Sequence, residues 1–338
     1  MELSPSSVAE AFGLGAPTGP LVAITGGPGA LHRSGRLSTS RGLFAVKVFS
    51  RGHHTHGVEA LAGPMCLELA ALAAGVPMPR PCLAVATGAG VAEVAGPGPQ
   101  PVLVGVHEWV EGTTPTAPAP TGLAAELGAA LAAIHRVGFR CSEDTQVDPW
   151  FRAAHGAAHW EGLAERAEQA GRGWAGRLRA TLPLLAEVEA LAAARAAKTV
   201  PLLMTHSDLV PGNVLVSMEG RPWIVDWDDA GPWNPTEEVA AAVVSWSSGA
   251  LGEPDEPVAL ALAEGYRQAG GGLQEHSPTV LAGSLSAVAN WLELNVRRSL
   301  REATSRPFHA QADAEIAGAL SELAWRLARL DRWMELLG

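Results

Sequence analysis

The sequence predicts an α+β fold with two lobes, a small β-rich N-terminal lobe and a larger α-helical lobe that contains an embedded β-hairpin. Short apolar runs separated by turns fill residues 20–50, helical spacing of apolar residues begins after residue 120, and a strand-like island lies at 202–228. The length of 338 residues agrees with two lobes, because a typical domain has about 100–200 residues.

The first lobe has the pattern of an antiparallel sheet. A Gly-rich turn at 26–29 separates the first two apolar runs. A helix is expected to open at Pro64 and to close at Gly75, because Pro is tolerated in the first helical turn and Gly ends helices. The expected strands lie at 21–24, 31–39, 44–49, 82–87 and 101–110.

A Pro/Thr-rich stretch at 113–120 has the composition of a connector. Beyond it, Leu123, Leu127 and Leu131 recur at helical spacing, and this helix is expected to end near Gly138. The sequence is therefore expected to divide into an N-terminal lobe, a hinge with connector, and a helical lobe, over residues 1–105, 106–122 and 123–338 respectively.

Charge and composition exclude several classes of protein. With 24 basic and 35 acidic residues the net charge is −11, which argues against nucleic-acid and anionic-membrane partners and favours small neutral or cationic ones. Three widely spaced cysteines build neither a disulfide framework nor a zinc-type pair. No secretory signal or membrane-spanning run is visible, so a cytoplasmic location is expected. The oligomeric state is not encoded in any pattern that we recognise.

Three oxygen-bearing side chains stand out in the 202–228 island. Asp208 and Asn213 flank a Pro-Gly turn that leads into an apolar strand, and Asp226 ends a second apolar strand. A hairpin would bring these three residues to neighbouring ends. Mg²⁺ prefers such hard oxygen ligands and usually takes one or two from the protein. A remaining carboxylate can accept a proton from an attacking hydroxyl.

Lys47 is unusual because the chain contains only two lysines among its 24 basic residues. It interrupts an apolar strand-like run at 44–49, where a compact ammonium group could bind phosphate. Glu68 follows in the next expected helix and could face it. His53, His54 and His56 form a further cluster, but their context favours a solvated loop over a metal site.

The pattern His206-x-Asp208-x-x-x-x-Asn213, followed by Asp226-Trp227-Asp228, resembles the aminoglycoside phosphotransferase family, which has a bilobal protein-kinase-like fold. The resemblance covers most of the chain. Where the family usually has Gly after the His, this chain has Ser207. The resemblance implies an ATP-dependent transfer of the γ-phosphate to a hydroxyl group with the help of Mg²⁺, and it leaves GTP open as an alternative donor.

The resemblance also implies roles for individual residues. Asp208 would be the catalytic base, with Asn213 and Asp226 as Mg²⁺ ligands. Lys47 would bind the α/β-phosphates, with Glu68 as its ion-pair partner and Glu59 as the competing choice. The remaining nucleotide contacts would come from the turn glycines Gly27 and Gly29, the Glu108 carbonyl and the Val110 amide.

The acceptor is expected to be an aminoglycoside or another cationic antibiotic, which would give the protein a role in resistance or self-protection. A kinase of a small metabolite, of the choline, ethanolamine, homoserine or hexosamine type, is the first alternative. A nucleotide-binding module without turnover is the second. Candidate acceptor contacts are the acidic and aromatic residues Asp229, Glu237, Glu238, Trp291 and Glu293.

Overall fold

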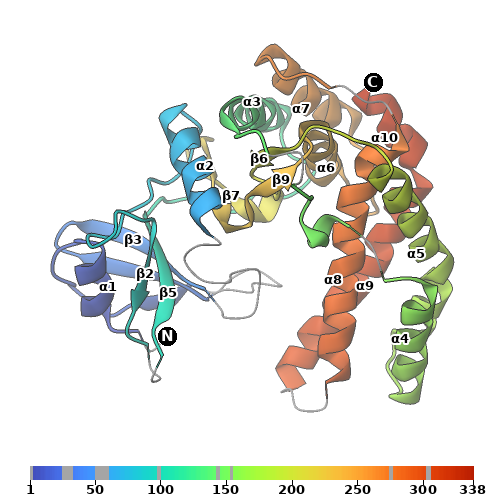
Figure 1. The fold of residues 1–338 in the computed structure, drawn as a ribbon, viewed down its shortest axis with the longest axis horizontal. Coiled ribbons are helices and arrows are strands. Elements are labelled where there is room, and N and C mark those ends of the chain that lie inside the picture. Colours follow the sequence, from blue (N-terminus) through green and yellow to red (C-terminus); the bar gives the residue numbers. More distant parts are fainter. Residues whose placement is uncertain are drawn as a thin grey trace. The chain divides into compact units, whose positions relative to one another are not determined.

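The computed structural model describes residues 3–24, 33–49, 61–96, 100–141, 145–152, 155–273, 277–301 and 306–338. It forms two compact units that are each discontinuous in sequence (Figure 1). The first unit comprises Met1–Pro115, Ala133–Phe139 and Met204–Gly231, and the second comprises Thr116–Ala132, Arg140–Leu203 and Pro232–Gly338. The Met204–Gly231 segment belongs to the first unit, although the segments on both sides of it in the sequence belong to the second.

The first unit is built on a five-stranded sheet in which every neighbouring pair is antiparallel. The apolar run around Lys47 forms a strand, as predicted, and this strand lies at the centre of the sheet. In spatial order, the strands are β1 (Val22–Ile24), β2 (Arg33–Thr39), β3 (Gly42–Val48), β5 (Val102–Glu108) and β4 (Val91–Val94).

One face of this sheet is the core of the unit. Side chains alternate across a strand, and Phe44, Val46 and Val48 of β3 are all buried. They pack in one hydrophobic cluster with Val8 of helix α1 (Pro5–Ala11). The same alternation places Lys47 on the opposite face of the sheet.

Helix α2 (Ala62–Ala73) follows the sequence prediction, with Pro64 in its first turn. The expected strand at 82–87 is wrong. The chain there forms a turn in which Gly88 has φ +70° and its amide bonds the Ala84 carbonyl at 2.7 Å. The strand forms after this turn, as β4, because Val91 and Val94 can then bury their side chains.

The predicted hairpin in the 202–228 island is present. Strands β7 (Val214–Val216) and β8 (Pro222–Ile224) pair antiparallel, and single 3₁₀ turns lie at Pro211–Asn213 and Trp227–Asp229. β6 (Leu203–Thr205) pairs with β9 (Gly231–Trp233) in a second two-stranded sheet.

The second unit is helical. In Figure 1 the long helices α8 and α9 run side by side, with α4 and α5 packed along them. A short 3₁₀ turn at Pro149–Phe151 packs on α8 and another lies at Pro278–Leu281. The helices are α3 (Thr121–Val137), which continues into the first unit, α4 (Ala157–Gln169), α5 (Ala175–Ala196), α6 (Pro235–Ser247), α7 (Glu256–Gln268), α8 (Ala282–Leu300), α9 (Arg306–Ala328) and α10 (Leu330–Leu337).

Glycines allow α3 and α7 to approach closely. A Cβ atom on Gly265 would lie 2.2 Å from the Ala125 carbonyl oxygen, and one on Gly128 would lie 2.1 Å from the Leu262 carbonyl oxygen. Two backbones at this separation exclude any side chain between them.

Within the described ranges, no helix is both long enough and apolar enough to cross a membrane.

Candidate active site

Lys47 is the centre of a charged cluster in the first unit. Its ammonium group contacts one carboxylate oxygen of Asp226 and one of Asp228. In the sheet, Lys47 lies opposite Ser34 on one side and Gly105 on the other, so small residues surround the base of its side chain. The structure therefore brings together the lysine of the central strand and the aspartate that follows the hairpin.

Asp226 adopts an unusual backbone conformation. Its φ of +68° lies in the left-handed region that favours glycine and costs a residue with a side chain about 1–2 kcal/mol. The preceding amide of Val225 bonds the Asn213 carbonyl at 3.0 Å, and the following Trp227 is buried. These contacts on both sides hold the Asp226 carboxylate at the end of β8 in spite of the strain.

The three charges of this cluster change one another's pKa. Burial alone would lower the pKa of Lys47, but the neighbouring Asp226 and Asp228 carboxylates outweigh it and raise that pKa. Burial would raise the pKa of Asp226, but its hydrogen bond with Asp228 and the charge of Lys47 hold it well below the usual range. Burial and the adjacent Asp226 both raise the pKa of Asp228. Lys47 and Asp228 thus shift the pKa of the Asp226 carboxylate in the direction that favours its ionised form.

His206 holds the loop that carries Asp208. Its ring is fully buried and packs edge-on against Trp227, with ring centroids 4.7 Å apart. The Asp208 amide donates to Nδ1 at 3.4 Å, which makes Nε2 the protonated nitrogen that donates to the Val225 carbonyl at 3.2 Å. His206 therefore ties the Asp208 loop to the segment that ends in Asp226.

Ser207 occupies the position where the resembling family usually has glycine, and its φ is +67°. Its hydroxyl compensates for part of the strain, because it lies 3.2 Å from the Thr205 hydroxyl and 3.3 Å from the Gly231 carbonyl oxygen. A left-handed backbone at both Ser207 and Asp226 is typical of functional sites, where the surrounding structure holds strained residues in place.

Asn213 is oriented by Asp208. Its Nδ2 donates to the Asp208 carboxylate at 2.6 Å and to the Asp208 main-chain oxygen at 2.9 Å. Both partners are acceptors, so the amide nitrogen is identified and Oδ1 points elsewhere, with no hydrogen-bond partner among the described residues. An amide oxygen is a hard ligand of the kind that Mg²⁺ takes from proteins.

Glu68 has a different partner from the one expected. The expected partner was Lys47. In the structure, the Glu68 carboxylate lies 2.6 Å from Nε2 of His107 on β5. His107 faces the same side of the sheet as Lys47, so α2 lies over that face. The competing Glu59, and Gly27 and Gly29 of the expected nucleotide loop, lie outside the described residues.

The residues expected to meet the adenine lie at the end of β5. Glu108 is the last residue of that strand, and its amide bonds the Arg80 carbonyl at 2.8 Å. Two residues later, the Val110 amide has no acceptor in the part of the chain that the structure describes. An unused amide at a strand end can bind the edge of a base.

The candidate acceptor residues are scattered. Asp229 is exposed in the first unit. Trp291 bonds Glu315 at 3.1 Å through its indole nitrogen, and Glu293 is buried beside Arg297 on α8.

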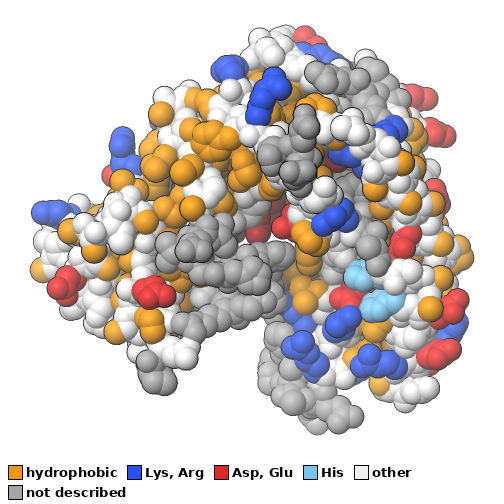
Figure 2. All heavy atoms as spheres, viewed as in Figure 1, with side chains coloured by type: hydrophobic (Ala, Val, Ile, Leu, Met, Phe, Trp, Pro, Cys, Tyr) orange, Lys and Arg blue, Asp and Glu red, His pale blue; other side chains and the backbone are white. Residues whose placement is uncertain are grey.

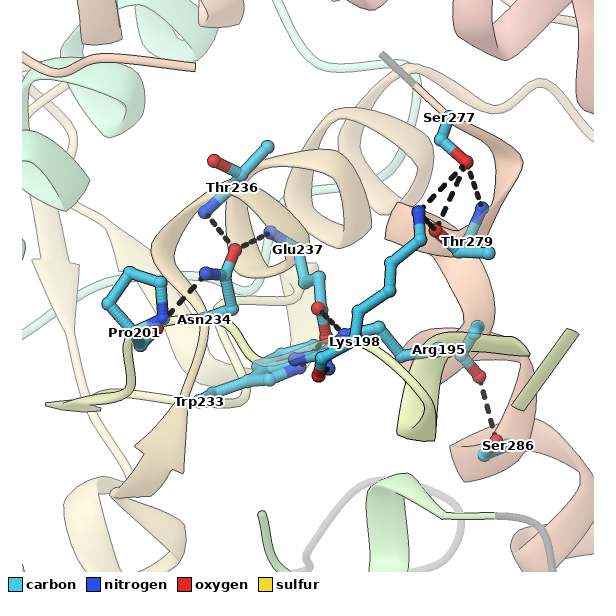
Figure 3. Close-up of polar contacts among 11 residues, drawn as sticks. Arg195, Lys198, Pro201, Trp233, Asn234, Thr236, Glu237, Ser277, Thr279 and Ser286 are labelled. Carbon is cyan, nitrogen blue, oxygen red and sulfur yellow. Dashed lines mark hydrogen bonds and ion pairs between the residues drawn. The ribbon is translucent and has the colours of Figure 1, made fainter. Parts of the chain in front are cut away.

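Glu237 and Glu238 lie in the core of the second unit, only 3% and 1% exposed. Figure 3 shows that Glu237 forms an ion pair with Arg195 and accepts a hydrogen bond from the Trp233 indole, at 3.0 Å. This burial differs from the acceptor contact expected for both residues, and it gives Glu237 a structural role.

Two site residues were not assigned from the sequence. Asp228 completes the contact with Lys47, and the repeated aspartate in Asp226-Trp227-Asp228 was its only signal. His107 binds Glu68, but a lone histidine in an apolar strand gives no indication of its partner.

Comparison with known proteins agrees with this arrangement. A sequence model described as the phosphotransferase enzyme family matches residues 26–273. Comparison with curated protein sequences found no significant match.

Several solved structures have a similar fold. A spectinomycin phosphotransferase in complex with ADP and spectinomycin has a TM-score of 0.62 and 12% identity, over 91% of this chain and 92% of that one. An amicoumacin kinase in complex with AMP-PNP and Ca²⁺ has a TM-score of 0.61 and 16% identity, over 94% and 92%. A choline/ethanolamine kinase family protein from Mesorhizobium loti has a TM-score of 0.57 and 19% identity, over 98% and 97%. At these identities the likeness establishes the fold, and it confirms the mixed α+β arrangement expected from the sequence.

Proposed function

The chain belongs to the phosphotransferase enzyme family, and from this we propose that it transfers the γ-phosphate of ATP to a hydroxyl group of a small cationic molecule. The observation that carries the proposal is the convergence of Lys47, Asp226 and the Asp208–Asn213 pair within one compact unit. An amine-bearing antibiotic of the aminoglycoside type is the acceptor class that the net charge of −11 favours.

Each residue has a separate task in this reaction. Asp208 accepts the proton of the attacking hydroxyl, and its hydrogen bonds with Asn213 keep the carboxylate oriented. Lys47 places a positive charge beside the phosphates, held in position by Asp226 and Asp228. The free Oδ1 of Asn213 and the carboxylate of Asp226 would hold Mg²⁺, which neutralises negative charge on the phosphates when it is bound.

A kinase of an amino alcohol is the second candidate. Its support is the choline/ethanolamine kinase family protein, whose fold matches this chain over 98% of its length. Both candidates have a cationic amine near the accepting hydroxyl, so they share the same chemistry at Asp208. They differ in the size of the acceptor.

Substitution of Asp208 tests the mechanism. Asp208→Asn is expected to lower turnover by about 10²–10⁴-fold, because the amide cannot accept the hydroxyl proton. ATP binding, followed by calorimetry, is expected to change little. Glu219→Gln is the matched control, because Glu219 is an exposed carboxylate in the same hairpin. Full turnover in Asp208→Asn would contradict the assigned role.

An acceptor screen tests the substrate class. Purified protein is incubated with ATP, Mg²⁺ and one acceptor from a panel of aminoglycosides, other amine-bearing antibiotics, choline and ethanolamine, and the product is identified by mass spectrometry. We expect a mass increase of one phosphate on an amine-bearing antibiotic. Phosphorylation of the amino alcohols alone would support the second candidate, and ATP binding with no product from any acceptor would argue for a binding module.

A further inference from the structure

A cluster of potential metal ligands lies in the second unit and takes no part in the proposed reaction. One side-chain atom from each of His155, His159 and Glu293 lies within 4.8 Å of the others. His155 lies two residues before α4, His159 lies in its first turn, and Glu293 lies on α8. In Figure 2 the histidine side chains on the visible face gather at one place near α4 and α8, beside acidic and basic side chains.

The ring of His155 is held in one orientation. Nδ2 of Asn290 donates to the Trp150 carbonyl at 2.7 Å, which identifies the other amide atom as the oxygen. That oxygen lies 2.6 Å from Nε2 of His155, so Nε2 must be the protonated nitrogen. Nδ1 then carries the lone pair, and it can bind a metal ion while Nε2 keeps its hydrogen bond. Metal-binding histidines are commonly held by this kind of outer hydrogen bond.

The main chain on this side of the cluster is also fixed. Glu189 of α5 accepts hydrogen bonds from the amides of His155 and Gly156, at 3.1 and 2.7 Å. The ring of Trp160 packs edge-on against both histidine rings, at centroid distances of 5.3 and 5.7 Å. The two imidazoles are stacked 4.9 Å apart. Such a preorganised pair loses little conformational freedom when it binds an ion.

His159 has a buried nitrogen without a hydrogen bond. Its Nε2 lies 3.2 Å from a carboxylate oxygen of Glu293, yet it makes no hydrogen bond within the described ranges. Glu293 is itself 9% exposed. A buried ring nitrogen that faces a carboxylate without bonding it is the arrangement that a cation between the two would complete.

We propose that His155, His159 and Glu293 form a binding site for a divalent transition-metal ion of the zinc class. Two imidazoles and one carboxylate suit Zn²⁺, whereas Mg²⁺ prefers oxygen ligands alone. The donor atoms of a tetrahedral zinc site lie about 3.4 Å apart, so side-chain movements of about 1 Å would close the cluster around the ion. Three protein ligands leave the fourth position to water.

The neighbouring Arg297 does not block this site. It contacts the Glu293 carboxylate one turn along α8, but its own side chain is 55% exposed. An ion pair with so exposed a partner is weak, and the arginine can leave to solvent when a doubly charged ion takes its place. The ion would link α4 to α8 in the helical unit.

Metal uptake by the full-length chain tests the site. The protein is freed of metal with a chelator and then titrated with Zn²⁺ against a chromogenic chelator, with excess Mg²⁺ present to fill oxygen-ligand sites. We expect one Zn²⁺ per chain. His155→Ala, His159→Ala and Glu293→Gln are each expected to lose at least about 10-fold in affinity. A triple alanine variant at His53, His54 and His56 is the control and should bind as the wild type does.

Cobalt gives a readout that does not depend on the variants. Co²⁺ bound by two imidazoles and a carboxylate in a tetrahedral site is expected to show intense visible absorption without a thiolate charge-transfer band. Circular dichroism of each variant verifies that it is folded. The proposal is overturned if the wild type takes up no stoichiometric Zn²⁺, if uptake survives both single alanine variants at His155 and His159, or if the triple control loses it.

Discussion

The buried pair between Glu237 and Arg195 gives the sharpest test of the core of the helical unit. Both Glu237 oxygens accept from N–H groups, one from Arg195 and the other from the Trp233 indole. We consider Glu237→Gln, which keeps the size of the side chain and removes its charge. A glutamine has one oxygen, so it can serve only one of these donors, and its NH₂ group then faces the other.

The expected loss of stability follows from these contacts. Arg195 is only 13% exposed, and its Nη2 is buried with no hydrogen-bond partner in the described chain, so Glu237 supplies its counter-charge. Removing one partner of a buried ion pair costs about 3–5 kcal/mol, and part of this is the unsatisfied donor, at about 1–3 kcal/mol. We therefore expect Glu237→Gln to lower the free energy of unfolding by about 3–5 kcal/mol.

Urea unfolding measures this change. The matched control is Glu187→Gln, the same substitution at an exposed position of the helix that carries Arg195; it should change stability by less than about 0.5 kcal/mol. Replacing Arg195 and Glu237 together by methionine should destabilise less than the glutamine variant, because no uncompensated charge remains. If Glu237→Gln is as stable as the control and instead raises KM for the acceptor, then Glu237 contacts the acceptor and our account of the pair is wrong.

Three further predictions concern other parts of the structure. Ser207→Gly is expected to be about 1 kcal/mol more stable to urea than S207A, because both lose the hydroxyl contacts but only glycine adopts φ +67° without strain; equal stabilities would contradict this. Gly265→Ala should lose about 1–3 kcal/mol, because its Cβ would meet a carbonyl oxygen, whereas Gly162→Ala, which has open space in α4, should gain about 0.5–1 kcal/mol. Burial and the nearby Glu108 raise the pKa of Cys82 to about 11, so about 0.1% of this thiol is thiolate at pH 8. Mass spectrometry should show iodoacetamide modifying the exposed Cys66 first, with the Cys82 rate rising about tenfold per pH unit up to pH 11; fast labelling of Cys82 at pH 8 would refute this.

Sequence patterns that extend over only a few residues predicted how Lys47 is oriented and where the hairpin forms. The alternation of apolar residues at 44–48 placed Lys47 on the face of the sheet away from the core, because successive side chains of a strand point to opposite faces. The Pro-Gly turn after Asp208 and the apolar run before Asp226 predicted a hairpin, which β7 and β8 form. In both cases the local geometry of the backbone is enough to predict where a side chain lies from its place in the sequence.

The partners of charged side chains were decided by tertiary structure. Lys47 and Asp226 are 179 positions apart, and nothing local indicated that Asp228 would share the ammonium group or that Glu68 would bind His107 in place of it. The burial of Glu237 depends on where α5 and α6 pack, because its ion-pair partner Arg195 lies on α5. The interaction between two charges depends on the distance between them. For residues far apart in the sequence, this distance is set only when the helices and strands pack together.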